Sequence, residues 1–79
     1  MSEQEITGEV IGERIRKARE AAGLNQKEAA AAADMNLRNY QHYEAGRKLA
    51  SIPVLVRIAN ALGATWEELL PEVPATRGE

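Results

Sequence analysis

Three polar side chains that carry hydrogen-bond donors recur along the stretch from residue 37 to residue 45. If this stretch is helical, a rotation of about 100° per residue groups Arg38, Gln41 and His42 on one side, opposite two tyrosines. Such side chains suit the edges of nucleic-acid bases and phosphate oxygens, and Arg with guanine is the commonest specific contact. The alternative is that these side chains are only the solvated face of a surface helix.

The sequence offers few residues for catalysis or metal binding. His42 is the only histidine and the chain has no cysteine, so a metal site would lack its usual nitrogen and thiolate ligands. Ser51 and Thr65 are placed as helix caps rather than as nucleophiles. We therefore predict that the protein is not an enzyme and that it holds no metal and no cofactor.

Charge is distributed unevenly along the chain. The 79 residues carry a net charge of −2, but residues 14–57 carry +5, residues 1–13 carry −4 and residues 58–79 carry −3. A net acidic chain argues against a nucleic-acid partner, and a basic centre argues for one. No apolar stretch approaches the roughly 20 residues that span a bilayer, and the absence of cysteine favours a reducing cytoplasm.

The apolar periodicity and the helix-ending residues predict an all-α fold of five short helices. Alanine, the best helix former, accounts for 14 of the 79 residues, and no stretch alternates as a half-buried strand would. The expected helices follow N-caps at Thr7, Asn25, Asn36, Ser51 and Thr65, with capping boxes at the second and the fifth. They end at about residues 22, 33, 45, 62 and 70. We expect residues 7–70 to form one domain, residues 1–6 a disordered acidic lead and residues 71–79 a flexible C-terminal tail.

Small and aromatic residues leave two interpretations open. The apolar face of the first helix is expected at residues 11, 15, 18 and 22. The alanine run at residues 29–33 is a close-packing helix face or a groove for a partner, and we favour the first. Trp66 belongs to the core or to a dimer seam rather than to a ligand platform.

Residues 26–45 have the dimensions of a helix-turn-helix unit, because two short helices flank a three-residue turn. Motifs around this unit follow a fixed order, namely Ile11-Gly12-Glu13-Arg14-Ile15-Arg16, Arg19, Gly23-Leu24-Asn25-Gln26, Tyr40, Glu44-Ala45-Gly46-Arg47-Lys48, Ala59-Asn60-Ala61-Leu62-Gly63 and Glu67-Glu68-Leu69-Leu70. From about residue 11 to residue 70 the chain thus resembles the lambda-repressor-like, Cro/CI-type (XRE) helix-turn-helix family. The resemblance implies a compact five-helix DNA-binding domain.

The resemblance also implies residue roles. Base contacts are expected from Arg38 and His42, with flanking contacts to bases or backbone from Leu37, Asn39 and Gln41. Phosphate contacts are expected from Gln26, at the start of the second helix, and from the loop residues Arg47 and Lys48. Arg19 and Glu44 match an internal ion pair that joins the first helix to the third and has a structural role.

The chain departs from the family pattern at three positions. Ala29 stands where the family usually has Leu, Asp34 where it has Gly, and Ala50 where it has Pro. Asp tolerates the left-handed conformation less well than Gly. We expect Tyr40 and Tyr43 to fill the volume that larger aliphatic residues occupy in relatives.

These patterns predict a sequence-specific regulator of transcription, acting as a repressor, that binds a double-stranded DNA operator. It would be a cytoplasmic homodimer that places its third helix in the major groove, with a seam that includes Trp66, Leu69 and Leu70. The alternative is a protein-interaction module, such as the antitoxin of a toxin–antitoxin pair, with a toxin or a polymerase as its partner.

Overall fold

The computed structural model describes residues 7–70, which form four α-helices and one 3-10 turn and contain no strand. The elements are α1 (Gly8–Ala21), α2 (Gln26–Ala32), α3 (Leu37–Ala45), α4 (Ile52–Leu62) and η1 (Trp66–Leu69). The all-α prediction is confirmed, but the prediction of a fifth α-helix is wrong, because residues 66–69 make a single 3-10 turn. The predicted acidic lead (1–6) and C-terminal tail (71–79) lie outside the described residues.

Three of the five predicted side-chain caps are present. The hydroxyl of Thr7 accepts from the backbone N–H of Val10 at 3.2 Å, and Asn36 accepts from the backbone N–H of Asn39 at 2.7 Å. Asn25 and Glu28 form the predicted capping box, in which each side chain accepts from the other's backbone N–H.

The other two predicted caps, at Ser51 and Thr65, lack the capping hydrogen bond. Ser51 and Thr65 occupy N-cap positions with extended backbones, but neither side chain makes a capping hydrogen bond. The predicted capping box at Thr65 is therefore wrong. A 3-10 turn of four residues has no N-terminal α-helical turn for such a box to complete.

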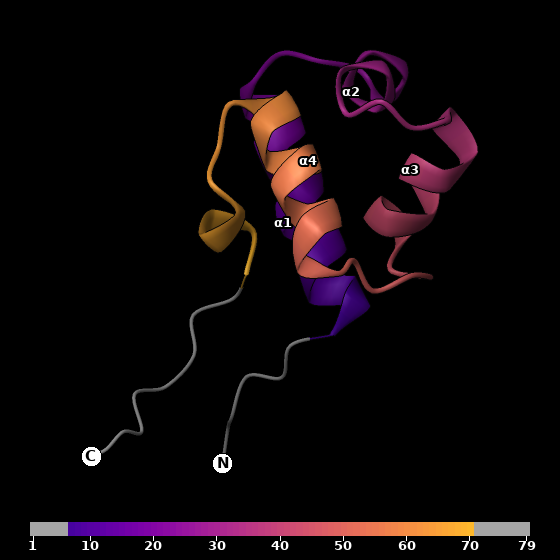
Figure 1. The fold of residues 1–79 in the computed structure, drawn as a ribbon, viewed down its shortest axis with the longest axis vertical. Coiled ribbons are helices and arrows are strands. Elements are labelled where there is room, and N and C mark those ends of the chain that lie inside the picture. The colour runs from indigo at the N-terminus through magenta and orange to yellow at the C-terminus, as the bar shows by residue number, and fades with distance from the viewer. Residues whose placement is uncertain (1–6, 71–79) are drawn as a thin grey trace.

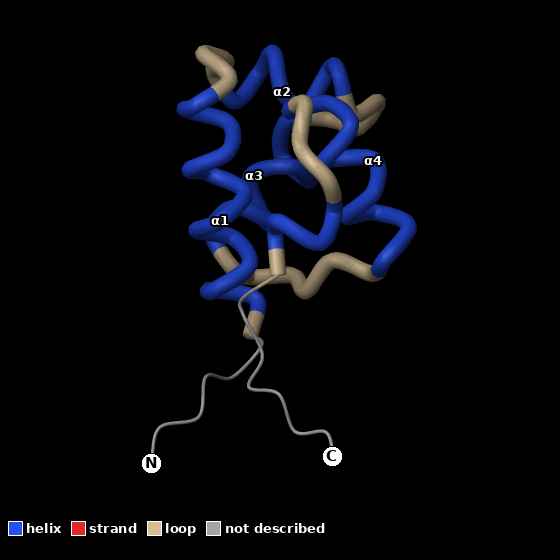
Figure 2. The backbone as a smooth tube through the Cα atoms, turned by 90° about the vertical axis from the view of Figure 1, so that its left-hand side faces the viewer, coloured by secondary structure: helices blue, strands red, loops and turns tan. Residues whose placement is uncertain are grey.

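Helices α1 and α4 lie against each other in the centre of the fold (Figure 1). The α2–α3 pair covers one side of them, with α3 packed on α1 and α2 packed on α4. Element η1 contacts both α1 and α4 on the other side. Helices account for most of the described chain, and its two ends emerge at the same end of the fold (Figure 2).

The core draws side chains from every element. Its largest fully buried members are Tyr40, Ile15, Leu55, Ile58 and Leu69. The alanines at 29, 30 and 33 are buried in the same cluster, so α2 contributes small residues and α3 a large aromatic one. Tyr43 is half-buried against this cluster. The expectation that residue 22 joins the apolar face of α1 is wrong, because it follows the end of the helix and is exposed.

Helices α1 and α3 cross with their backbones nearly in contact at Gly12. A Cβ atom at this position would lie 2.4 Å from the carbonyl oxygen of Glu44 and 2.6 Å from that of Tyr43. Only glycine allows this approach without moving one of the helices. The crossing places the C-terminal part of α3 against α1. The Glu44 side chain is buried there.

Candidate nucleic-acid interface

The turn between α2 and α3 is held by a side chain from α4. Asp34 adopts a left-handed conformation with φ of 60°, which glycine adopts more readily than other residues. The guanidinium of Arg57 donates to the carbonyl oxygen of Ala33 at 3.1 and 3.3 Å and to that of Asp34 at 2.6 Å. Arg57 thereby donates to carbonyl groups of the C-cap residue of α2 and of the turn that follows it, and links this turn to α4.

Sequence reasoning did not assign this role to Arg57. The available signal was a single cation within the apolar stretch Ile52–Leu62, at a position that the helical periodicity leaves on the surface. The sequence alone does not show that this surface faces the turn.

Beneath α3, Arg19 and Glu44 form a two-bond ion pair. The Nε atom of Arg19 lies 2.6 Å from Oε2 of Glu44, and Nη2 lies 3.3 Å from Oε1. The Arg19 side chain is 13% exposed and that of Glu44 is 4% exposed, so the pair is almost dry. Arg19 also donates to the carbonyl oxygen of Leu24 at 3.0 Å, which ties the α1–α2 loop to the same centre.

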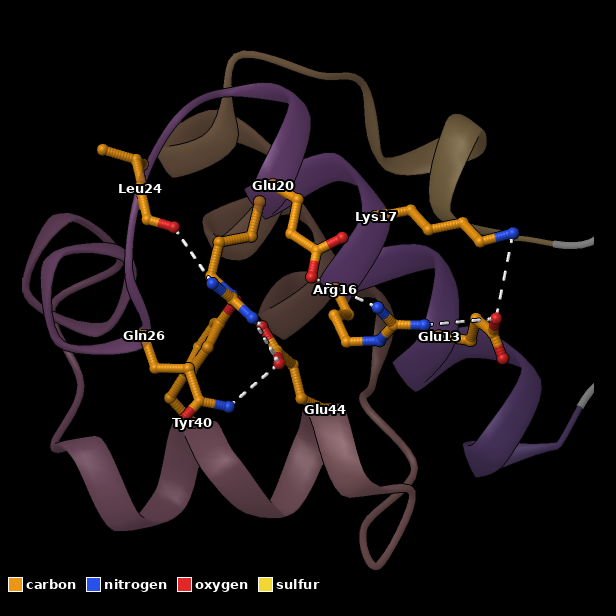
Figure 3. Close-up of polar contacts among 9 residues, drawn as sticks. Glu13, Arg16, Lys17, Glu20, Leu24, Gln26, Tyr40 and Glu44 are labelled. Carbon is orange, nitrogen blue, oxygen red and sulfur yellow. Dashed lines mark hydrogen bonds and ion pairs between the residues drawn. The ribbon is translucent and has the colours of Figure 1, made fainter.

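Glu44 collects two further donors, which are seen converging on it in Figure 3. The hydroxyl of Tyr40 donates to Oε2 at 2.6 Å, and Nε2 of Gln26 donates to Oε1 at 3.0 Å. Burial opposes ionisation of this carboxyl group, but the hydrogen bonds from Arg19, Tyr40 and Gln26 outweigh it and lower the pKa of Glu44. Burial, with the hydrogen bond to Glu44, raises the pKa of Tyr40, so the phenol stays a donor.

The predicted contact residues of α2 and α3 lie on adjoining surfaces. Gln26 is the first residue of α2, and its Oε1 accepts from Nε2 of Gln41 on α3 at 3.0 Å. Arg38 is exposed on the first turn of α3, and Leu37 beside it is 38% exposed. The tertiary structure thus brings together side chains from two helices that are separate in the sequence.

The loop after α3 folds back on the same helix. Nζ of Lys48 donates to Oδ1 of Asn39 at 2.6 Å and lies 5.7 Å from the centre of the Tyr43 ring. Nη1 of Arg47 lies 3.3 Å from Nδ1 of His42. Gly46, with φ of 82°, makes the reversal that allows these contacts. Arg47 therefore lies beside the polar side of α3, whereas Lys48 lies beside Asn39 and Tyr43.

A shallow groove of about 350 Å³ lies between α1, α2 and α3, and its lining residues are Arg16, Gln26, Gln41, Glu44, Ala45 and Arg47. Three of the predicted contact residues line it. The described residues include no group of three or more potential metal ligands, and no helix among them is long and apolar enough to cross a membrane.

Comparison with known proteins agrees with this geometry. The sequence model of a family described as a helix-turn-helix domain matches residues 10–73. No curated protein matches the chain. Among solved structures, the clp gene regulator ClgR from C. glutamicum is 27% identical, with 84% of this chain and 86% of that chain covered and a TM-score of 0.77.

Two further solved structures share the architecture. The restriction-modification controller protein C.AhdI from Aeromonas hydrophila is 27% identical, with 78% of this chain and 94% of that chain covered and a TM-score of 0.74. A hypothetical transcription factor from Neisseria has a TM-score of 0.78 over 90% of this chain and 84% of that chain, but at 20% identity it shows the fold alone.

The chain belongs to the helix-turn-helix domain family. The resemblance to Cro/CI-type regulators is confirmed, and the protein is a DNA-binding regulator of transcription of this class.

Proposed function

We propose that this regulator reads a specific operator by placing α3 in the major groove of double-stranded DNA. The observation that carries the proposal is the polar surface built by Gln26, α3 and the loop after it. Arg38 is exposed at the start of α3, where side chains of such a helix reach base edges. Arg47 and Lys48 lie beyond the end of α3, where they meet phosphates rather than bases.

The surface separates base reading from phosphate binding. Arg38 and His42 read bases, Leu37, Asn39 and Gln41 flank them, and Gln26, Arg47 and Lys48 bind the backbone. The contacts of Lys48 with Asn39 and of Arg47 with His42 hold both cations next to the reading helix, so little ordering remains for DNA to impose. Occupation of an operator by a protein of this size blocks access to it, and we therefore propose repression.

The protein acts as a homodimer on a two-fold operator in this proposal, with half-sites about one helical turn, roughly 34 Å, apart. The predicted seam around η1 needs revision, because Leu69 is 1% exposed and belongs to the core. Trp66 and Leu70 are half-buried, whereas Leu49 is 61% exposed and Ile52 is 48% exposed. Sedimentation that finds a monomer both free and on DNA would contradict the homodimer.

Selection from random double-stranded DNA with the full chain tests the function. We expect an operator with two-fold symmetry and an affinity that falls steeply with salt, because phosphate contacts release counterions. A protein that enriches no sequence and binds bulk DNA without salt dependence would contradict the proposal. Such a DNA-directed function places the protein in the cytoplasm and gives it no catalytic role.

A protein partner, such as a toxin or a polymerase, is the second candidate. The observation that favours it is a groove of about 550 Å³ between α1 and η1, elements that carry none of the proposed DNA contacts. Glu13, Arg14, Lys17 and Glu68 give this groove charges of both signs. An antitoxin-like module would enrich no sequence from random DNA and would bind its protein partner without DNA.

A further inference from the structure

The side-chain amide of Gln26 links the buried ion pair to the proposed reading surface. Its Nε2 donates to Oε1 of Glu44 at 3.0 Å, and its Oε1 accepts from Nε2 of Gln41 at 3.0 Å. Figure 3 shows Gln26 directed at Glu44 from above α3. A chain of two hydrogen bonds therefore runs from a carboxylate that is 4% exposed to a half-buried glutamine at the groove.

The chemistry of the carboxylate sets the orientation of both amides. An ionised Glu44, paired with Arg19, can only accept hydrogen bonds, so Gln26 must turn its NH₂ group toward it. The carbonyl oxygen of Gln26 then faces the other way, and Gln41 must present its own NH₂ group to that oxygen. Within residues 7–70 the carbonyl oxygen and the second N–H of Gln41 are left for an external partner.

We propose that Glu44 is a positioning residue for base reading, and that through Gln26 it holds the amide of Gln41 in the orientation that recognises adenine. In the major groove adenine offers an N6 donor beside an N7 acceptor. Guanine offers two acceptors, cytosine a donor and thymine an acceptor with a methyl group. The free acceptor and donor of Gln41 match adenine alone. This inference rests on the proposed function, because it names one base that α3 reads.

Oε2 of Glu44 has a structural role alone, whereas Oε1 also holds Gln26. Oε2 takes the short contacts from Nε of Arg19 and from the hydroxyl of Tyr40, both at 2.6 Å. Oε1 takes Gln26. A change at Tyr40 therefore perturbs the buried centre without removing the amide chain, and a change at Gln26 removes the chain while leaving the ion pair. Within residues 7–70 the second N–H of Gln26 has no partner, so it can contact a phosphate.

The test uses the full-length protein and the operator that it selects from random DNA, with each A·T pair replaced in turn by the other three pairs. Affinities are compared for the wild type, Gln26→Ala, Gln41→Ala, the double variant and, as the matched control, Tyr40→Phe. All are measured at a temperature at which circular dichroism shows each variant folded. Glu44→Gln is included under the same condition.

We expect one A·T pair in each half-site to be read by Gln41. When this pair is replaced, the DNA affinity of the wild type and of Tyr40→Phe should fall about 5- to 150-fold, the range of one bidentate contact. The same replacement should lower the affinity less than twofold in the variants that lack the oriented amide, namely Gln26→Ala, Gln41→Ala and Glu44→Gln. The double variant should be no less selective than either single variant, as expected for residues that act in one chain.

Two results would overturn the inference while the proposed function stands. In the first, Gln26→Ala weakens all sequences equally and keeps the adenine preference, which is the behaviour of a phosphate contact alone. In the second, the Gln26 and Gln41 variants change selectivity additively. A wild type that selects no operator would instead remove the proposed function itself, and the inference with it.

Discussion

Arg19 and Glu44 stand 25 positions apart in the sequence and meet in an ion pair beneath α3, with Nε and Oε2 2.6 Å apart. The pair joins α1 to α3, the helix that carries most of the proposed DNA contacts. Because Glu44 also binds Gln26, the same carboxylate serves the core and the reading surface.

Removal of Arg19 should destabilise the protein strongly. In Arg19→Ala the carboxylate of Glu44, which is 4% exposed, would lose its only ion-pair partner among the described residues. Breaking such a pair costs about 3–5 kcal/mol of unfolding free energy, since a buried charge is left without a counter-charge. Urea unfolding at neutral pH measures this loss.

Arg16→Ala is the matched control for that measurement. Arg16 pairs with Glu13 and Glu20 at 3.4 and 3.2 Å, but its side chain is 43% exposed. Solvent-exposed pairs of this kind contribute about 1 kcal/mol or less. Equal losses of unfolding free energy in the two variants would show that the Arg19–Glu44 pair stabilises the protein no more than an exposed pair does.

Stability should fall as the pH is lowered through the acidic range. The pKa of Glu44 in the folded protein lies below the ordinary glutamate value of 4.5, so the folded state favours the ionised form. Its contribution is complete above that value and is lost as the pH falls through the lower pKa of the folded state. The change in melting temperature between pH 6 and pH 3 should therefore be smaller in Glu44→Gln than in the wild type. A parallel decline in the two proteins would contradict this assignment.

The turn between α2 and α3 should respond to two substitutions in opposite directions. Asp34→Gly should raise the unfolding free energy by about 0.5 kcal/mol, because relief of the left-handed strain exceeds the entropic cost of glycine. Arg57→Met should lower it by about 1 kcal/mol, because the carbonyl groups of Ala33 and Asp34 lose a shared donor. Asp34→Ala serves as the control and should not stabilise. Thermal unfolding distinguishes these outcomes, and a stabilised Asp34→Ala would exclude the strain argument.

Substitution of Arg38 should change base selectivity, whereas substitution of Arg47 should change only the overall DNA affinity. Arg38→Ala should cost about 1–3 kcal/mol on the best operator and flatten the preference at one base pair per half-site. Arg47→Ala should weaken all sequences nearly equally and reduce the salt slope by about one per subunit. Both are compared on matched and mismatched duplexes across a salt series. A uniform loss in Arg38→Ala with an altered base preference in Arg47→Ala would reverse the assignment of the reading surface.

The sequence by itself determined the class of fold, the positions of the four α-helices and the family. These features depend on local chemistry: the caps at Thr7, Asn25 and Asn36 act within one helical turn, and glycines follow α1, α3 and α4. Local rules failed at Thr65, where the cap-like sequence opens a 3-10 turn, because packing against α1 and α4 decides the geometry of so short a segment.

Only the tertiary structure decided which polar side chains meet. The hydrogen bonds of Arg57 to the turn, of Gln26 to Glu44 and of Gln41 to Gln26 all join residues from different elements. Hydrogen bonds need partners within about 3 Å, and that distance depends on how the helices cross. The crossing is in turn set by close backbone contacts such as the one at Gly12, where α1 and α3 touch, and these arise only when the whole core is assembled.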